Sequence, residues 1–346
     1  MDQPQQAPDV SSYRRIMQSV RGFMLTQALH VAAKLALFDH IGDGDASPAE
    51  LAQATGAHEP SLRRLLRFLG SLDVLRETAE GRFRIGELGR ALRADHPFSA
   101  RAMAIMYGEP FIWQAWGSLH EAVLSGRSAF EVAHGEPLFD HLARHPQDAA
   151  VWEAAMSGAT AIEVPAVLPA YDFSRFARVV VVGGRGLLLV GLLKRYPQMS
   201  GIVCCAGPAD PAIRARIEAA PDWPEVADRC RIADGDAFAF GSIPPGADLY
   251  LIKRVLHEWD DPEAVRLLTN VRAAIPDTGT LLVLDAVLKA PNESDLAQWL
   301  DLNMLALLSG RERTEDELAG LLSEAGFRLA RTVPAGALSI LEAVPF

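Results

Sequence analysis

From residue 178 to the C-terminus, short apolar runs alternate with amphipathic segments of helical period. The first pair reads VVVVGGRG followed directly by LLLVGLLKRYP, so an apolar strand passes through glycines into a helix. Continuous apolar strands are typical of a parallel sheet covered by helices on both faces, and such sheets bind ligands at the carboxyl ends of their strands. The alternation therefore predicts an α/β sheet, with strands at 179–182, 201–205, 231–233, 247–255, 278–288, 327–334 and 338–344.

The N-terminal part has a different pattern. Apolar residues recur every three or four positions from about Tyr13 to Ile41, which predicts helical structure. The stretch SPAE at 47–50 is typical of a helix N-terminus, and a second helix opens at Pro60. LRETAEGRFRI then predicts two short strands around a glycine turn. Helix, turn, helix and hairpin together predict a winged helix, and residues 95–170 are predicted to be helical again.

The composition restricts the classes of function. The chain has 346 residues, 49% of them hydrophobic, and this length and hydrophobic content suit two packed domains. Its net charge is -11. Phosphate binding needs clustered Lys and Arg, so the acidic balance opposes a nucleic-acid partner. Three cysteines without CxxC spacing indicate no metal site and no disulfide framework. Residues 1–12 are polar and no uncharged run reaches about 18 residues, so we expect a cytoplasmic protein without membrane contact.

A winged helix often binds DNA, and Arg63, Arg64 and Arg67 would form a basic face on this one. The apolar residues around these arginines are dense, and the whole chain is acidic. A dimerisation or packing module is therefore the favoured interpretation, with a DNA-binding regulator as the weakest alternative.

Three features together carry a family resemblance: ADLYLIKRVLHEWDDPEAVRLLTNVRAAI, DLNMLALLSGRERTEDELAGLLSEAGF and the N-terminal winged-helix pattern. They resemble the small-molecule O-methyltransferases of the acetylserotonin and caffeic-acid type, including the bacterial polyketide-tailoring branch. The resemblance runs from about residue 15 to residue 346. It implies a homodimer and a class I methyltransferase sheet of Rossmann type. The expected domains are a winged-helix dimerisation domain at 13–95, a helical linker and substrate-pocket region at 96–170, and a Rossmann-like methyltransferase-fold domain at 171–346.

The resemblance also implies three catalytic residues. His257 matches the family's general base, which takes the proton of a substrate hydroxyl, and an imidazole pKa near 6.5 suits that role. Asp285 in LVLDAVL and Glu312 in SGRERTEDEL match the acidic positions that hold the histidine and the substrate. Either carboxylate alone could be a helix cap or a surface group. The coincidence of all three positions favours acid–base chemistry.

A substrate pocket is expected where the helical region meets the sheet. The aromatic stretch MYGEPFIWQAWGSL could line it, although core packing is the alternative for each single residue. The candidate pocket residues are Met106, Phe111, Trp113, Trp116, Trp259, Asn303 and Met304.

The cofactor motifs match the family less well. The family's first motif reads VVDVGGGTG, whereas this chain has Val181 at the acidic position and a loop that is one residue shorter and contains Arg185. Cys205 stands where the family has an aspartate that binds the ribose hydroxyls, and GDAF replaces GDFF. The candidate cofactor residues are Gly183, Gly184, Gly186, Cys205, Asp236 and Lys253.

These differences affect the expected chemistry. A thiol is a weak hydrogen-bond acceptor, and losing a charged acceptor costs about 1.5–3 kcal/mol. The combined changes predict a loss of roughly 10² to 10⁴ in affinity for S-adenosylmethionine. We therefore expect an enzyme of bacterial secondary metabolism that uses His257 for acid–base chemistry on a small, partly apolar metabolite without a cofactor. The expected reactions are isomerisation, cyclisation, dehydration and hydrolysis.

Two alternatives stay open. One is an S-adenosylmethionine-dependent O-methyltransferase of a phenolic or polyketide hydroxyl, with a divergent cofactor loop. The other is a non-catalytic partner subunit, which the retention of His257, Asp285 and Glu312 opposes because a scaffold does not need them.

Overall fold

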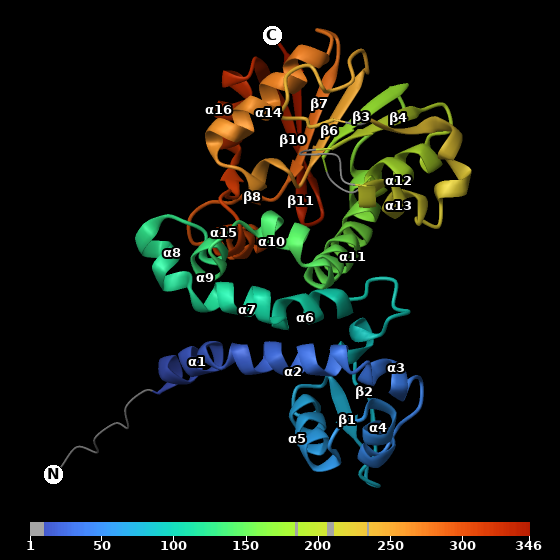
Figure 1. Cartoon of the computed structure of the whole chain (residues 1–346), viewed down its shortest axis with the longest axis vertical. Coiled ribbons are helices and arrows are strands. Elements are labelled where there is room, and N and C mark those ends of the chain that lie inside the picture. Colours follow the sequence, from blue (N-terminus) through green and yellow to red (C-terminus); the bar gives the residue numbers. More distant parts are fainter. Residues whose placement is uncertain (1–9, 184–185, 206–210, 234) are drawn as a thin grey trace, which may run out of the picture. The chain divides into compact units, whose positions relative to one another are not determined.

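A computed structural model describes residues 10–183, 186–205, 211–233 and 235–346. The chain divides into two compact units. The first unit comprises Met1–Trp113 and Gln147–Gly158, and the second comprises Gln114–Pro146 and Ala159–Phe346 (Figure 1). No helix among the described residues is long and apolar enough to cross a membrane.

The first unit is mainly helical and contains one small hairpin. Its main elements are α1 (Ser11–Val20), α2 (Gly22–Lys34), α3 (Leu37–Ile41), α4 (Pro48–Thr55), α5 (Glu59–Gly70), β1 (Leu75–Glu77), β2 (Phe83–Ile85) and α6 (Arg101–Gly108). The expected order of helix, helix and hairpin is present, and β1 pairs antiparallel with β2 around Gly81, whose φ is 71°. Ser47 and Glu50 form a reciprocal capping box at the start of α4. Phe38, Leu66 and Phe83 lie fully buried in the core of this unit.

The helical pattern predicted from about Tyr13 to Ile41 is present but is not one continuous helix. The segment forms three helices, with breaks at Arg21 and at residues 35–36, where Ala36 has a left-handed backbone. A spacing of three or four residues does not reveal such breaks, because the apolar positions stay in register across them.

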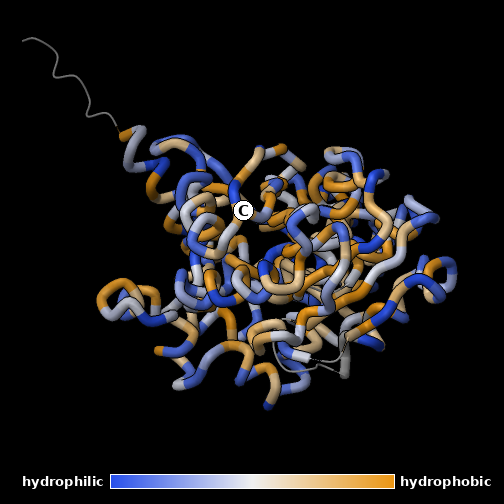
Figure 2. Tube along the Cα trace, turned by 90° about the horizontal axis from the view of Figure 1, so that it is seen from above, coloured by the Kyte–Doolittle hydropathy of each residue, from blue (hydrophilic) through white to orange (hydrophobic). Residues whose placement is uncertain are grey.

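Helices connect the hairpin region to the large sheet. They are α7 (Pro110–Gly117), α8 (Leu119–Ser125), α9 (Ala129–His134), α10 (Leu138–Arg144) and α11 (Pro146–Ala170). Hydrophobic and hydrophilic residues alternate along much of the trace, as expected of amphipathic elements (Figure 2).

The second unit contains a seven-stranded sheet with the order β10-β11-β7-β6-β3-β4-β5. Its strands are β3 (Arg178–Val182), β4 (Ser200–Cys204), β5 (Cys230–Ala233), β6 (Leu249–Lys253), β7 (Thr280–Asp285), β10 (Phe327–Ala335) and β11 (Leu338–Pro345). The helices between them are α12 (Leu187–Arg195), α13 (Pro211–Glu218), α14 (Asp261–Ala274), α15 (Leu296–Leu307) and α16 (Glu315–Glu324).

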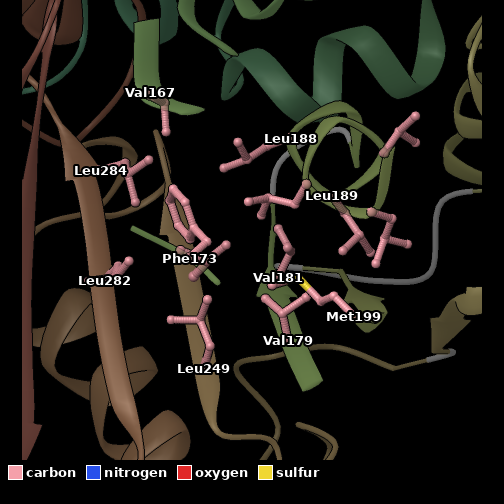
Figure 3. Close-up of a cluster of buried hydrophobic side chains, with 14 of the residues drawn as sticks. Val167, Phe173, Val179, Val181, Leu188, Leu189, Met199, Leu249, Leu282 and Leu284 are labelled. Atoms are coloured by element: carbon pink, nitrogen blue, oxygen red, sulfur yellow. The ribbon is translucent and has the colours of Figure 1, made fainter. Parts of the chain in front are cut away.

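Alternate residues of the strands point to opposite faces of the sheet and belong to two different buried hydrophobic clusters. Val179 and Val181 belong to one cluster with Leu188 and Leu189 of α12, part of which is drawn in Figure 3. Val180 and Val182 belong to the other cluster, together with residues of α14 and α16. Burial on both faces explains why β3 reads as an uninterrupted run of valines.

The predicted parallel arrangement is absent at one edge of the sheet. Five strands are parallel, whereas β10 and β11 form an antiparallel hairpin and β11 pairs antiparallel with β7. The link between β10 and β11 is too short for the crossover that parallel strands require. The predicted strand 278–288 also ends early, because β8 (Val287–Leu288) leaves the sheet to pair with β9 (Arg313–Thr314).

The amino ends of the central strands are joined through Asp248. Its carboxylate accepts hydrogen bonds from the backbone N–H groups of Ala177 and Arg178 at 2.8 and 2.9 Å. Its carbonyl oxygen accepts the N–H of Thr280 at 3.0 Å. One residue thus links the starts of β3, β6 and β7.

Replacing Asp248 with alanine is expected to lower the free energy of unfolding by about 2–3 kcal/mol, because two backbone donors lose a charged acceptor. Urea denaturation followed by circular dichroism measures this change. Asp248→Asn keeps one acceptor oxygen and should lose less. Equal stability of the alanine variant and the unmodified protein would contradict this role.

Candidate functional site

The structure brings the three predicted catalytic residues together at the carboxyl ends of β6 and β7. His257 lies in a short 3-10 turn (Leu256–Glu258) after β6, Asp285 is the last residue of β7, and Glu312 directly precedes β9. All three side chains are buried and line one small recess. The Nδ1 atom of His257 lies 2.7 Å from Oε1 of Glu312.

Pairing of the short strands β8 and β9 explains how Glu312 reaches this place. Val287 pairs with Arg313, so the chain just after Asp285 runs beside the chain just after Glu312. The N–H of Glu312 also donates to Oδ1 of Asp301 on α15 at 3.0 Å. The early end of β7 therefore helps to form the site.

The loop that carries His257 is held from two sides. Arg313, whose side chain is 1% exposed, donates to the carbonyls of Leu256 at 3.0 Å and Trp259 at 2.8 Å, and its Nε donates to Asp261 at 2.9 Å. On the other side Gly310 approaches the loop so closely that a Cβ atom would lie 2.0 Å from the His257 carbonyl oxygen. Only glycine fits at position 310 without a shift of backbone.

Several polar atoms of this region are buried without a hydrogen-bond partner among the described residues. They are both carboxylate oxygens of Asp285, Oε2 of Glu312, Nε1 of Trp259 and Oδ1 of Asn303. Buried polar atoms are normally hydrogen-bonded, so a cluster of unpartnered ones marks a place where a ligand or water completes the bonding.

Burial dominates the electrostatics of the site. It lowers the pKa of His257 to about 4, although the Asp285 carboxylate opposes this shift. It raises the pKa of Asp285 to about 6, against the effect of His257. It also raises the pKa of Glu312 to about 7, against the effect of the Arg254 guanidinium. At neutral pH the imidazole is therefore uncharged and able to accept a proton.

The predicted pocket residues lie in both units. Met106, Phe111 and Trp113 belong to the first unit, and the first two are buried. Trp116, Trp259, Asn303 and Met304 belong to the second unit, where Asn303 and Met304 are buried on α15. A pocket shared by all seven stays a prediction.

The candidate cofactor residues fit their expected roles unequally. Gly183 and Gly186 have φ values of 72° and 74°, which suit the tight turn between β3 and α12. Gly184 lies outside the described residues, as does Arg185. Oδ1 of Asp236 accepts the N–H of Phe238 at 2.9 Å.

Cys205 does not fit the role of ribose acceptor. The residue is 4% exposed and belongs to the same buried hydrophobic cluster as Val203 and Ile217. Among the described residues, the end of β4 therefore offers no carboxylate to the two hydroxyls of a ribose. Lys253 is buried and pairs with Glu163, and burial lowers the pKa of its ammonium against the attraction of that carboxylate.

Sequence reasoning missed the residues that surround the three predicted ones. Glu163, Arg254 and Arg313 all contact the site or its loop. Arg254 directly follows Lys253 and Arg313 directly follows Glu312 in the sequence. This proximity to predicted site residues was the signal that could have identified both arginines. Glu163 lies in α11, far away in sequence, and carried no signal of its own.

One group of side chains elsewhere among the described residues could offer metal ligands. The ligand atoms of Glu136, His141 and His145 lie within 4.8 Å of one another. However, Arg144 pairs with Glu136, and the rings of His141 and His145 stack at 3.9 Å. Stacked rings direct their nitrogen lone pairs in parallel, and the guanidinium already balances the carboxylate, so we assign no metal here.

Replacing Gly310 with alanine should destabilise the protein by about 2–4 kcal/mol, because the new methyl group displaces the backbone around His257. Gly320 in α16 is the matched control, since nothing lies within 4 Å of a Cβ added there. Gly320→Ala should be neutral or slightly stabilising in urea denaturation. If both variants unfolded at the same urea concentration, the close approach of Gly310 would be unimportant.

Comparisons with known proteins agree with this architecture. Residues 17–95 match the O-methyltransferase dimerisation domain, and residues 116–328 match the O-methyltransferase domain. The phenazine O-methyltransferase PhzM of Lysobacter antibioticus is 40% identical over 332 residues, covering 95% of each chain. The aclacinomycin 10-hydroxylase RdmB of Streptomyces purpurascens is 34% identical over 335 residues, covering 94% of this chain and 87% of its own.

A solved structure shows the same likeness together with bound ligands. NcsB1, an O-methyltransferase from neocarzinostatin biosynthesis, was solved with S-adenosylmethionine and 2-hydroxy-5-methyl naphthoic acid. It is 31% identical, with a TM-score of 0.78 and coverage of 93% of this chain and 96% of its own. The chain therefore belongs to the O-methyltransferase family and combines that family's dimerisation and catalytic domains.

Proposed function

We propose that this protein is an S-adenosylmethionine-dependent methyltransferase that acts on an acidic hydroxyl of a small aromatic metabolite in secondary metabolism. The observation that carries the proposal is the buried pair of His257 and Glu312, with 2.7 Å between Nδ1 and Oε1. The unpartnered carboxylate of Asp285 lines the same recess.

Deprotonation of the hydroxyl is the step that this site serves. Glu312 in its ionised form accepts the Nδ1–H of His257, which leaves Nε2 free to take the substrate proton. The resulting imidazolium is stabilised by Glu312 and by the nearby Asp285 carboxylate. S-adenosylmethionine, when bound, supplies an electrophilic methyl group for the oxygen that this proton has left.

The turn glycines Gly183 and Gly186 would hold the cofactor, together with Asp236. The thiol of Cys205 would contribute little at the ribose, so we expect the affinity to be lower than is usual for such enzymes. The relatives support methyl transfer, since one is named a phenazine O-methyltransferase and the O-methyltransferase NcsB1 was solved with a naphthoic acid bound. They support it better than the cofactor-free chemistry expected from the sequence.

We also propose that the protein is a homodimer. The match to a dimerisation domain supports this assignment. Exposed apolar side chains on α1 and α2 provide a surface for a second copy, namely Tyr13, Ile16, Val20, Phe23 and Met24.

The proposal is tested with methyl-labelled S-adenosylmethionine and a panel of hydroxylated naphthoates, benzoates and phenazines. We expect label to enter at least one compound, and His257→Gln to reduce that rate by about 10² to 10⁴. His120→Gln changes an exposed histidine and serves as the control. Full activity of His257→Gln would exclude His257 as the base.

Cofactor-independent proton transfer by His257 is the second candidate, and the burial of Cys205 favours it. The hydroxylase among the relatives also indicates that family membership alone does not determine the reaction. In this case the dialysed protein converts a substrate without added cofactor and without the gain of a methyl group. Mass spectrometry of the products separates the two candidates.

A further inference from the structure

Arg254 follows β6 directly and has a left-handed backbone, with a φ of 55°. Such a backbone is uncommon in residues other than glycine. Its N–H donates to the carbonyl of Leu284 at 3.0 Å, which keeps the residue attached to β7. With this backbone conformation, the long cationic side chain of Arg254 reaches the carboxylates of the site. A glycine would adopt the same conformation more readily but would bring no charge.

The guanidinium of Arg254 lies between two carboxylates. Its Nε is 3.4 Å from Oε1 of Glu163, and its Nη1 is 3.4 Å from Oε1 of Glu312. The exposed fractions of the side chains are 22% for Arg254, 11% for Glu163 and 0% for Glu312. The Arg254–Glu312 contact is therefore poorly screened by solvent.

The oxygen of Glu312 that contacts Arg254 is the one that contacts His257. This shared oxygen links the charge of Arg254 to the position of the imidazole hydrogen. An ionised Glu312 accepts Nδ1–H and leaves Nε2 as a base. A protonated Glu312 donates to Nδ1, which moves the ring hydrogen to Nε2 and removes the base.

Several other charged groups face this pair. Asp285 on β7, Glu163 on α11 and Lys253 on β6 act on His257, besides Arg254. Asp301 on α15, Arg313 on β9 and Glu163 act on Glu312. Of the cations, Arg313 is occupied by Asp261 and the carbonyls of the His257 loop, and Lys253 pairs with Glu163. Among the described residues, Arg254 is the cation that contacts the shared oxygen, at 3.4 Å.

We propose that Arg254 is a positioning residue that keeps Glu312 ionised and thereby holds His257 in the tautomer with its hydrogen on Nδ1. Glu163 moderates this effect by drawing the same guanidinium toward itself. The proposal rests on the role of His257 as base in the proposed function. A lysine cannot replace this arginine fully, because a compact ammonium does not span two carboxylates as a planar fork does.

The test combines a spectroscopic readout with a pH profile. Protein labelled with ¹⁵N-histidine reports the tautomer of each ring by NMR, and the His257 signals are those lost in His257→Gln. At pH 8 the unmodified protein should show hydrogen on Nδ1. Arg254→Met should shift this ring toward hydrogen on Nε2 and move the acid limb of the rate profile up by about one pH unit.

Glu163→Gln supplies a second variant with the opposite expectation. Without this carboxylate, Arg254 interacts with Glu312 alone, and a negative charge near Glu312 is lost. Both changes favour the ionised form of Glu312, so the acid limb should move to lower pH. Loss of packing alone would not move the two variants in opposite directions. Arg63→Met changes a partly exposed arginine of α5, far in sequence from the site, and should alter neither readout.

The proposal is overturned if Arg254→Met leaves both the tautomer and the acid limb unchanged, or if Glu163→Gln moves that limb upward. These outcomes are separate from failure of the proposed function. The ring signals report on Arg254 even if His257 is not the base. The turnover of His257→Gln reports on the base alone.

Discussion

A single hydrogen bond between two buried groups organises the catalytic half of this protein. His257 and Glu312 come from segments 55 residues apart in the chain, yet their side chains meet at 2.7 Å with almost no exposure to solvent. Neighbouring residues hold these two side chains in place. Arg313 holds the carbonyls around His257, Gly310 allows the two loops to touch, and Asp301 fixes the backbone at Glu312.

The same arrangement has an energetic cost. Asp285 is buried with neither oxygen bonded to any described residue, and burial raises the pKa of its carboxyl and that of Glu312. Groups with a raised folded-state pKa stabilise the protein most below their unfolded pKa, and this contribution is lost as the pH rises through about 6 to 7. An unpartnered buried carboxylate lowers stability, and such groups are common at functional sites, which agrees with the proposed role of Asp285.

Much of the fold was accessible from the sequence because the strands are buried on both faces. The run of valines at 179–182 and its glycine turn have one reasonable interpretation, and β3 confirmed it. The antiparallel edge was predictable in principle, since Gly336 lies in a link too short for a crossover. The breaks at Arg21 and Ala36 were not, because the apolar positions on either side keep helical spacing.

The site divides in the same way. His257, Asp285 and Glu312 lie within sequence motifs that match the family. Their proximity therefore followed from the resemblance. Glu163 could not be found, because its relevance depends on where α11 places it against Lys253 and Arg254. Arg254 is the neighbour of Lys253 in the sequence, but its proposed positioning role depends on a left-handed backbone conformation. The sequence does not predict that conformation.

The proposed function joins the His257–Glu312 pair to a glycine turn whose sequence differs from the family motif, so cofactor binding is the decisive property to measure. Titration calorimetry of the cofactor-free protein with S-adenosylhomocysteine, the product form of the methyl donor, measures it most directly. Methyl transfer predicts saturable binding with one site per chain, weaker than the micromolar range typical of enzyme ligands because Cys205 replaces a carboxylate. No heat of binding at millimolar ligand would contradict methyl transfer and would assign His257 to chemistry that needs no cofactor.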